Sequence, residues 1–206
     1  MILNNMSYHE IATHLSADKQ QVDKFARSIK YAKYRSKAIK LKRYPLFFKP
    51  VFFTSPQYNR WFVVPHVRNR KDLEYMPYYL GCIFKYHEKI AMYMQMNINV
   101  GNLGILDLIF TSAFFERYAN RNELEKMTGE EIVFHFIQSL YHVGLQQVIS
   151  QNPDKYVMFN EIGMGLGYKD VKNKKLIVFK SYVTAKNGPE ELKQLHKNWK
   201  FLQSVF

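Results

Sequence analysis

Apolar and polar positions follow two periods along the chain, and the period of a helix comes first. Apolar residues at i, i+3, i+4 and i+7 predict a helix over residues 8–16 and a second over 18–41, with Asp18 as its N-cap. Tyr44-Pro45 ends the second helix, because proline disfavours helical backbone in the residue before it. The apolar stripe of this helix consists of Val22, Phe25, Ile29, Ala32 and Ile39.

A period of two predicts strands in the next part of the chain. Residues 46–53 and 60–67 flank a turn-like segment and indicate a hairpin. Pro65 indicates that its second strand lies at a sheet edge or stops there. Residues 79–86 and 89–98 indicate another hairpin, which turns at His87-Glu88 and precedes a loop over 97–104. One face of its second strand carries Ile90, Met92, Met94 and Met96.

Two helices are expected in the centre of the chain. A strand over 107–111 leads into the first, for which Ser112 is the expected N-cap and which runs to about Asn122. The capping box T-x-x-E that begins at Thr128 opens the second, which runs to about Val143.

Strands and a last helix complete the pattern. Strands are expected over 156–159, 161–169 and 176–184, and Pro189 is the expected first residue of the helix. The apolar stripe of that helix consists of Leu192, Leu195, Trp199, Leu202 and Phe206. These elements predict an α+β fold: a mixed or antiparallel sheet of hairpins, a helical arm over 1–43, and a core domain over 44–206 with a central helix pair and a C-terminal helix.

Gly163, Gly165 and Gly167 alternate with apolar residues, and this alternation indicates a strand with glycine on one face. A phosphate-binding loop is excluded, because that motif needs a turn from strand to helix. We expect a core helix to pack closely on the glycine face, and a ligand or a nucleic-acid backbone is the alternative.

Composition narrows the class of protein. Of the 206 residues 47% are hydrophobic, which is typical of a folded globular chain. The single cysteine, Cys82, excludes a disulfide within the chain and a cysteine-built zinc site. Neither a signal-peptide pattern nor an apolar run of about 20 residues is present. We expect a cytoplasmic protein without a membrane span, a cofactor or a bound metal; Glu131, His135 and His142 share a helical face but lack further ligands.

Charge indicates the kind of partner. The chain carries 30 Lys and Arg against 17 Asp and Glu, a net charge of +13. Residues 24–43 contain nine basic residues and no acidic one. Basic residues that neutralise phosphates release counterions, and Tyr31 and Tyr34, which lie among them, can stack on unpaired bases. The alternatives are a solvated helix face, a membrane-surface helix, or a site for an acidic protein.

Arg117 and Arg121 suggest a second anion site. They lie four residues apart at the border of an apolar helix face, and a guanidinium there suits a planar carboxylate or phosphate. The alternative is a structural salt bridge to Glu161, Glu116 or Asp107.

The strand over 176–184 is expected to bury one face and expose the other. The expected buried residues are Ile177, Phe179 and Val183, and the expected exposed ones are Val178, Lys180, Tyr182 and Thr184. Together with the basic segments, this strand completes the expected nucleic-acid-binding residues: Lys30, Lys33, Arg35, Lys37, Lys40, Arg117, Arg121, Lys169, Lys180 and Tyr182.

The stretch from Ile109 to Arg121, IFTSAFFERYANR, resembles the strand–helix motif I-T-x-H-x-x-x-R-x-x-x-R. This motif occurs in small phage and mobile-element proteins related to BrnT-type toxins of the RelE-like ribonuclease fold. The resemblance covers about residues 107–184 and implies that a helix, three strands and a late basic strand follow the motif. Ala113 stands in the place of the motif's histidine, so the resemblance implies a chain without that proton-transfer group.

These observations lead to three interpretations of function. The first is a nucleic-acid-binding protein, with RNA favoured over DNA, that is a non-catalytic relative of RelE-like toxins from a phage or mobile element. The second is a phage-type interaction or inhibitor protein that binds an acidic protein surface, which the Tyr-rich and Met-rich strands favour. The third is a ribonuclease with an altered active site.

Overall fold

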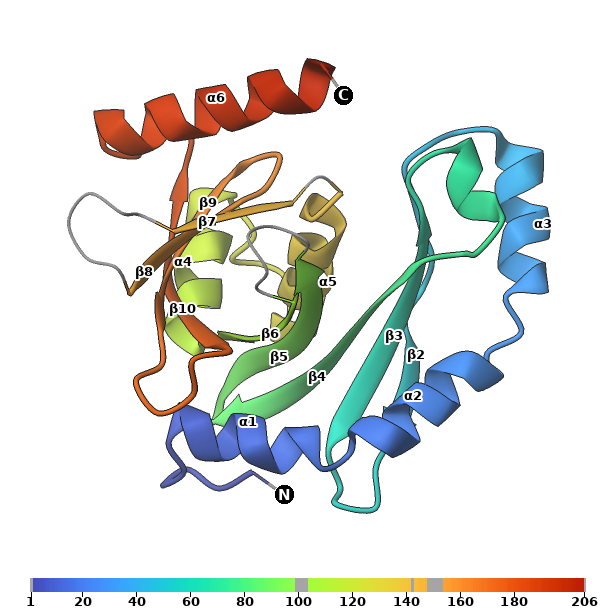
Figure 1. The fold of residues 1–206 in the computed structure, drawn as a ribbon, viewed down its shortest axis with the longest axis horizontal. Helices are drawn as coiled ribbons and strands as arrows, with labels where there is room; N and C mark the ends of the chain where they lie inside the picture. The colour runs from blue at the N-terminus through green and yellow to red at the C-terminus, as the bar shows by residue number, and fades with distance from the viewer. Residues whose placement is uncertain (1, 99–103, 142, 148–153, 206) are drawn as a thin grey trace.

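One long, bent sheet organises the chain in the computed structural model (Figure 1). The structure describes residues 2–98, 104–141, 143–147 and 154–205. Ten strands in this part of the chain join in the order β1-β3-β4-β5-β6-β10-β9-β8-β7, and β2 also pairs with β3. Neighbouring strands run antiparallel except β6 and β10, which run parallel. The predicted α+β class with a mixed sheet is confirmed.

The bounds of the elements follow the chain. The helices are α1 (Tyr8–Ser16), α2 (Lys19–Ser28), α3 (Ala32–Leu41), α4 (Ser112–Arg121), α5 (Gly129–Ser139), α6 (Glu190–Val205) and a short 3-10 helix, η1 (Arg70–Leu73). The strands are β1 (Leu46–Phe47), β2 (Val51–Thr54), β3 (Arg60–Val67), β4 (Tyr78–Tyr86), β5 (Lys89–Ile98), β6 (Gly104–Phe110), β7 (Gly144–Gln147), β8 (Lys155–Phe159), β9 (Gly163–Lys169) and β10 (Leu176–Thr184).

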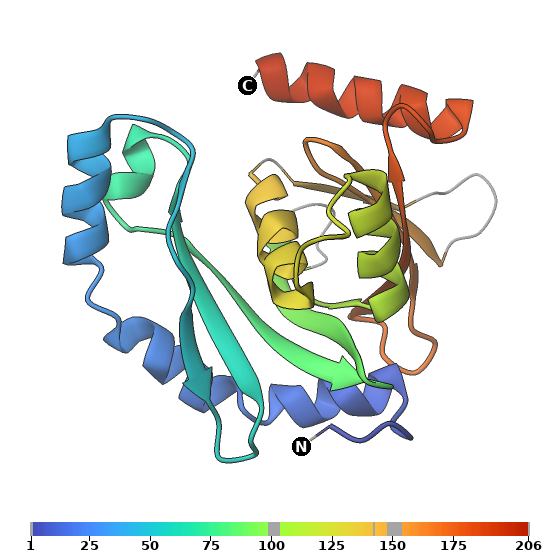
Figure 2. The ribbon, with the colours of Figure 1, turned by 180° about the vertical axis from the view of Figure 1, so that it is seen from behind.

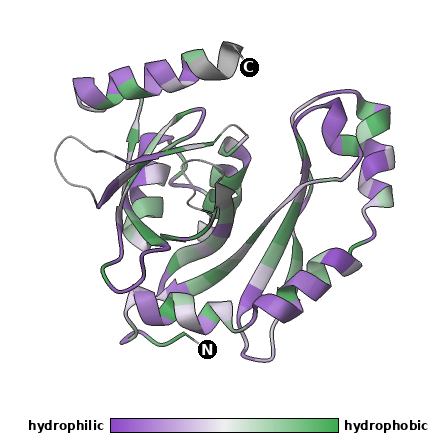
Figure 3. Cartoon of the chain, viewed as in Figure 1, coloured by the Kyte–Doolittle hydropathy of each residue, from purple (hydrophilic) through white to green (hydrophobic). Residues whose placement is uncertain are grey.

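Helices cover both faces of the sheet, and α4 and α5 lie together on one of them (Figure 2). There Phe110 of β6 packs against Phe114 of α4 and Phe136 of α5, with ring centroids 5.1 and 4.9 Å apart. On the other face Ile11 and Leu15 of α1 enter a buried cluster with strand residues. Figure 3 shows the result: hydrophobic colours run along the strands, and hydrophilic colours are frequent on α2, α3 and α6.

The predicted helix over 18–41 is two helices, because the backbone at Ile29 is extended (φ −65°, ψ 126°). The break shifts the helical phase, so that Ala38 is buried while Ile39 is 52% exposed, contrary to the predicted stripe. Residues 2–43, expected to form an arm, lie on the sheet and contribute buried side chains to its core.

Several helix ends in the structure differ from the predicted ends by a few residues. Thr111, not Ser112, is the N-cap of α4, because its hydroxyl oxygen accepts a hydrogen bond from a backbone N–H of the first turn. α5 ends at Ser139, before the predicted end, and Gly144 begins the unpredicted strand β7. Pro189 precedes α6 rather than opening it, and its carbonyl oxygen accepts a bond from the helix.

Pro65 lies neither at a sheet edge nor at the end of its strand, the two predicted alternatives, because β3 continues to Val67. β3 lies between β4 on one side and β1 and β2 on the other. β1 pairs with β3 at His66 and Val67, whereas β2 pairs with it from Arg60 to Val63, so Pro65 falls in the gap between the two. Pro65 thus lies just beyond the end of β1, where its carbonyl oxygen accepts from the N–H of Phe48 (3.0 Å).

The second hairpin is confirmed at its predicted turn. His87 and Glu88 both have positive φ (51° and 61°), as a two-residue turn of type I′ requires. Met92 and Met94 of β5 are buried beneath α4 and α5, and Ile90 and Met96 pack against the same cluster. Most of the loop predicted over 97–104 lies outside the described residues.

The glycine face of β9 packs against aromatic core residues. A Cβ on Gly165 would meet the Phe114 ring of α4 at 3.1 Å, and a Cβ on Gly167 would meet the Phe179 ring at 2.8 Å. The predicted close packing is confirmed, with α4 and the neighbouring strand as its partners.

Trp199 fixes α6 to the sheet, so we expect Trp199→Ala to lower the free energy of unfolding by about 3 kcal/mol. The indole is 8% exposed and stacks on Phe159 of β8, with centroids 5.8 Å apart and planes at 14°. Urea denaturation measures the loss. A loss below about 1 kcal/mol would show that α6 contributes little to the core.

Candidate nucleic-acid interface

Nine basic side chains project from α2, α3 and the residues after them. This basic array consists of Lys24, Arg27, Lys30, Lys33, Arg35, Lys37, Lys40, Lys42 and Arg43. All nine residues are exposed. None of them forms a salt bridge with a carboxylate in the described part of the chain. The array is therefore a surface of uncompensated positive charge.

The opposite side of these helices holds the array in place. Ala38 of α3 packs with Phe48, Val67 and Met76 near one end of the sheet. The Arg35 guanidinium adds a hydrogen bond from Nη2 to the backbone oxygen of Glu74, after η1 (2.9 Å). The charges are thus carried by anchored helices rather than by a free segment.

Tyr31 and Tyr34 pack inward and are not free to stack on bases as expected. The Tyr31 ring stacks on Tyr78 of β4 (5.9 Å, 13°), and its hydroxyl donates to the backbone oxygen of Ala26. The Tyr34 ring packs against Phe48 (5.0 Å). Burial raises the pKa of Tyr31. The tyrosines dock α3 onto the sheet because the break at Ile29 turns them toward it.

Arg117 and Arg121 are exposed on α4, and neither pairs with a carboxylate among the described residues. Arg117 donates from Nη1 to the backbone oxygen of Lys180 in β10 (3.0 Å). Two carboxylates considered as partners are engaged elsewhere: Glu116 pairs with Lys89, and Asp107 accepts from two neighbouring side chains. The arginines therefore remain available to an anion.

A β-bulge in β10 overturns the predicted exposure of Tyr182. Phe179 pairs with Gly167, but Ser181 pairs with Leu166, so Lys180 is the extra residue of the bulge. The bulge reverses the alternation beyond this point, and Tyr182 is 1% exposed in the core. Tyr182 is therefore excluded as a nucleic-acid contact.

The predictions for Val178, expected to be exposed, and for Val183, expected to be buried, are also wrong. Val178 is buried on the face covered by α1, because both faces of β10 are covered, and Val183 is only half-buried. Lys180 remains exposed, with its ammonium 4.7 Å from the centroid of the Tyr168 ring. Lys169 is half-buried at the end of β9.

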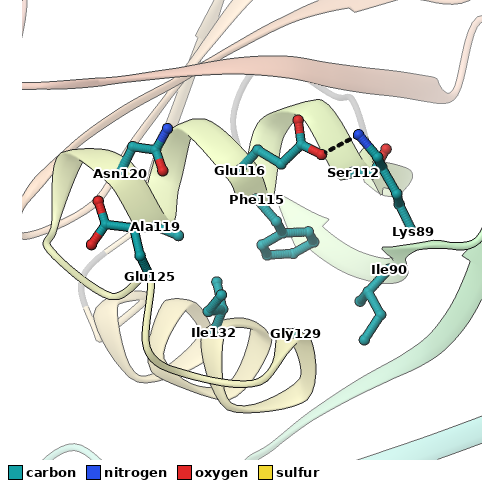
Figure 4. Close-up of a pocket in the computed structure, with 10 residues that line it drawn as sticks. All are labelled: Lys89, Ile90, Ser112, Phe115, Glu116, Ala119, Asn120, Glu125, Gly129 and Ile132. Atoms are coloured by element: carbon teal, nitrogen blue, oxygen red, sulfur yellow. Dashed lines mark hydrogen bonds and ion pairs between the residues drawn. The ribbon is translucent and has the colours of Figure 1, made fainter.

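A pocket between α4, α5 and the start of β5 carries one cationic side chain and two carboxylates (Figure 4). It encloses about 390 Å³, and Phe115, Ile90 and Ile132 supply apolar walls. Lys89 and Glu116 form an ion pair beside it (2.6 Å), and Glu125 adds a second carboxylate. This pocket lacks the cationic surplus that a polyanion needs, and the basic array does not contribute to it.

Sequence reasoning missed a buried hydrogen-bond network centred on Asn160, which is fully buried. The Asn160 side chain binds Ser139 and Tyr182, and the backbone oxygen of Asn160 lies 3.0 Å from Nε2 of His196. Only the polarity of an Asn beside a turn signals such a role in the sequence. Through Ser139, Tyr182 and His196 the network joins α5, β10 and α6.

Glu131 and His135, which share a helical face with His142 in the sequence pattern, have other partners in the structure. Nδ1 of His135 lies 2.8 Å from the Tyr118 hydroxyl, and Glu131 caps its own helix. His142 lies outside the described residues. No group of three His, Cys, Asp or Glu that could hold a metal ion occurs among the residues described.

The buried His66 makes the free energy of unfolding depend on pH. Its ring is buried between Phe47 and Tyr79. Burial, together with the charge of Arg68, lowers the pKa of His66 to about 4, against the opposing effects of the Val64 backbone and Asp72. Below pH about 6.5 the histidine is protonated in the unfolded chain but stays neutral in the folded one, so the free energy of unfolding falls as the pH falls toward 4.

Between pH 7 and pH 4 we expect the free energy of unfolding of the wild type to fall by about 3 kcal/mol more than that of His66→Phe, measured by urea denaturation. Equal losses in the two proteins would contradict this assignment.

Comparison of the chain with protein-family models, curated proteins and solved structures gave no match. No helix in the described ranges has the length and apolar character needed to cross a membrane. Function must therefore be argued from the site itself.

Proposed function

We propose that this protein binds nucleic acid through the basic array on α2 and α3. The observation that carries the proposal is that nine exposed cations lie together, with no salt bridge to a carboxylate among the described residues. A merely solvated helix face usually mixes both signs of charge, whereas residues 24–43 contain nine basic side chains and no acidic one. A phosphate backbone supplies the complementary negative charges.

The array suits contacts with phosphates rather than with base edges. Lysine and arginine side chains that neutralise phosphates release counterions, which makes binding strong at low salt and independent of sequence. Arg117, Arg121 and Lys180 are further exposed cations, on α4 and β10, and Lys169 is half-buried at the end of β9; we propose these residues as additional phosphate contacts.

The preference for RNA over DNA rests on the resemblance to the RelE-like fold. After the motif on β6 and α4, the chain continues through α5, β7, β8, β9 and β10, with β10 parallel to β6. Membership of that family stays a prediction. Ala113 is exposed on α4 in the place of the motif's histidine, so we propose binding without cleavage.

Gel-shift titrations with single-stranded RNA, double-stranded RNA and double-stranded DNA at 50 and 200 mM salt test this function. Six or more phosphate contacts predict an affinity loss of about 1,000-fold or more between these concentrations. The proposal also expects the tighter binding to be to RNA. The proposal would be overturned if none of the three nucleic acids bound at 50 mM salt, or if the affinity did not change with salt. Either result would favour an acidic protein as the partner.

A further inference from the structure

Tyr58 is an exposed aromatic side chain that contributes nothing to the core. It lies in the turn between β2 and β3 and is 77% exposed. Its backbone has φ 60°, a left-handed conformation that a bulky residue rarely adopts. Such strain persists only when the surroundings enforce it, and it is concentrated at functional sites.

Hydrogen bonds hold this turn rigidly. The Tyr58 N–H donates to the backbone oxygen of Ser55 (2.8 Å), and the Ser55 N–H donates to that of Asn59 (3.0 Å). The Asn59 amide donates from Nδ2 to the buried Asp18 carboxylate (2.8 Å), which also accepts from Nε1 of Trp61 (2.9 Å). The Tyr58 ring is thus presented to solvent by a fixed backbone.

The same bonds place Tyr58 beside the basic array. Asp18 is the N-cap residue of α2, so the turn is tied to the start of that helix. Phe25 of α2 stacks on Phe53 of β2 (4.9 Å, 19°), which keeps the helix beside the strand that leads to the turn. Figure 1 shows α2 alongside β2 and the β2–β3 turn.

A pocket of about 460 Å³ adjoins Tyr58, within the range of small-ligand sites. Leu3 and Phe84 give it apolar walls, and Lys85 and Glu88 line it with opposite charges. The Arg60 guanidinium, which also lines it, forms an ion pair with Glu130. The Asn4 amide oxygen, which also lines it, accepts from the N–H of His87 (2.8 Å). Its apolar walls suit a flat aromatic base, and the phosphates of the strand are left to the basic array.

We propose that Tyr58 stacks on an unpaired base of a single-stranded nucleic acid, in the pocket beside the ring, while the backbone of that strand continues along the basic array. This inference rests on the proposed function and narrows its substrate to unpaired strands. Aromatic rings stack on any base, because every base has a flat π face. α3 points in a different direction from α2 (Figures 1 and 2), and a flexible single strand follows such a bend more easily than a stiff duplex.

Fluorescence anisotropy with a labelled 12-nucleotide single-stranded RNA and its 12-base-pair duplex tests the inference. Tyr58→Ala is expected to weaken single-strand binding about 5- to 150-fold, the effect of losing one stacked base. Duplex binding should not change, and Tyr58→Phe should bind as wild type because it keeps the ring. Phe201→Ala is the matched control, since Phe201 is 67% exposed on α6, across the sheet, and should not affect binding.

Tyr58→Gly separates binding from folding. Glycine adopts positive φ without strain, so this variant should melt about 2–4 °C higher while binding single-stranded RNA as weakly as Tyr58→Ala. Wild-type-like single-strand binding by both variants would overturn the inference and leave the proposed function standing. Failure of the wild-type protein to bind either RNA would contradict the preference for RNA, and failure to bind double-stranded DNA as well would overturn the proposed function itself.

Discussion

Reversing four charges of the basic array is expected to abolish nucleic-acid binding and leave the protein folded. The variant combines Lys30→Glu, Lys33→Glu, Lys37→Glu and Lys40→Glu and lowers the net charge from +13 to +5, because each change removes two charges. All four lysines are exposed, and none forms a salt bridge in the described part of the chain. We expect at least about a 1,000-fold loss of affinity at 50 mM salt, since four phosphate contacts disappear and four repulsive charges replace them.

A second variant controls for net charge. Lys126→Glu, Lys186→Glu, Lys197→Glu and Lys200→Glu change the same number of exposed charges outside the array. This control should lose less than about tenfold in affinity, because it changes the long-range field and not the phosphate contacts. Circular dichroism and thermal melting verify that both proteins fold. Equal losses of affinity in the two variants would mean that binding depends on the total charge of the protein. No loss of affinity in the array variant would show that the array is not the binding site.

Asn160→Ala is expected to lower the free energy of unfolding by about 4 kcal/mol, because several buried groups lose their partner together. The Asn160 Oδ1 accepts from the N–H groups of Ile162 (3.2 Å) and Gly163 (2.8 Å) and from the Tyr182 hydroxyl (3.2 Å). Its Nδ2 donates to the Ser139 hydroxyl oxygen (2.8 Å). Alanine satisfies none of them.

Ser139→Ala is the matched comparison for the Asn160 network. It removes one bond to Asn160 and should lower the free energy of unfolding by only about 1 kcal/mol. Urea denaturation of both variants gives the two losses. A loss below about 1 kcal/mol for Asn160→Ala would show that water or local rearrangement replaces the network.

Elements with strong local signals could be predicted from the sequence. α1 has its predicted bounds, and the capping box at Thr128 opens α5 as expected. The turn at His87-Glu88 and the alternating methionines of β5 also appear where the pattern places them. In each case a few neighbouring residues determine the structure.

Features decided by contacts between distant segments could not be predicted. The break at Ile29 accompanies the stacking of Tyr31 on Tyr78, a residue that follows 47 positions later, and the apolar stripe gave no sign of it. The bulge at Lys180 inserts one residue into a regular alternation, so Tyr182 enters the core. No local pattern distinguishes a bulged strand from a regular one here.

The candidate site shows the same division. The charged side chains of the array were predictable because a run of like charges without partners stays in water. Tyr58 was not, because its segment signalled only a turn, and its exposure depends on the anchor between Asn59 and Asp18. An aromatic residue inside the Ser-Pro-Gln-Tyr-Asn turn was the available signal.

Lysine acetylation footprinting of the wild-type protein with and without single-stranded RNA tests the central claim most directly. Mass spectrometry reads the modification of each lysine, and RNA that lies on the array blocks the reagent there. We expect strong protection of Lys30, Lys33, Lys37 and Lys40 and unchanged labelling of Lys126 and Lys197. Equal labelling of the four array lysines with and without bound RNA would contradict it.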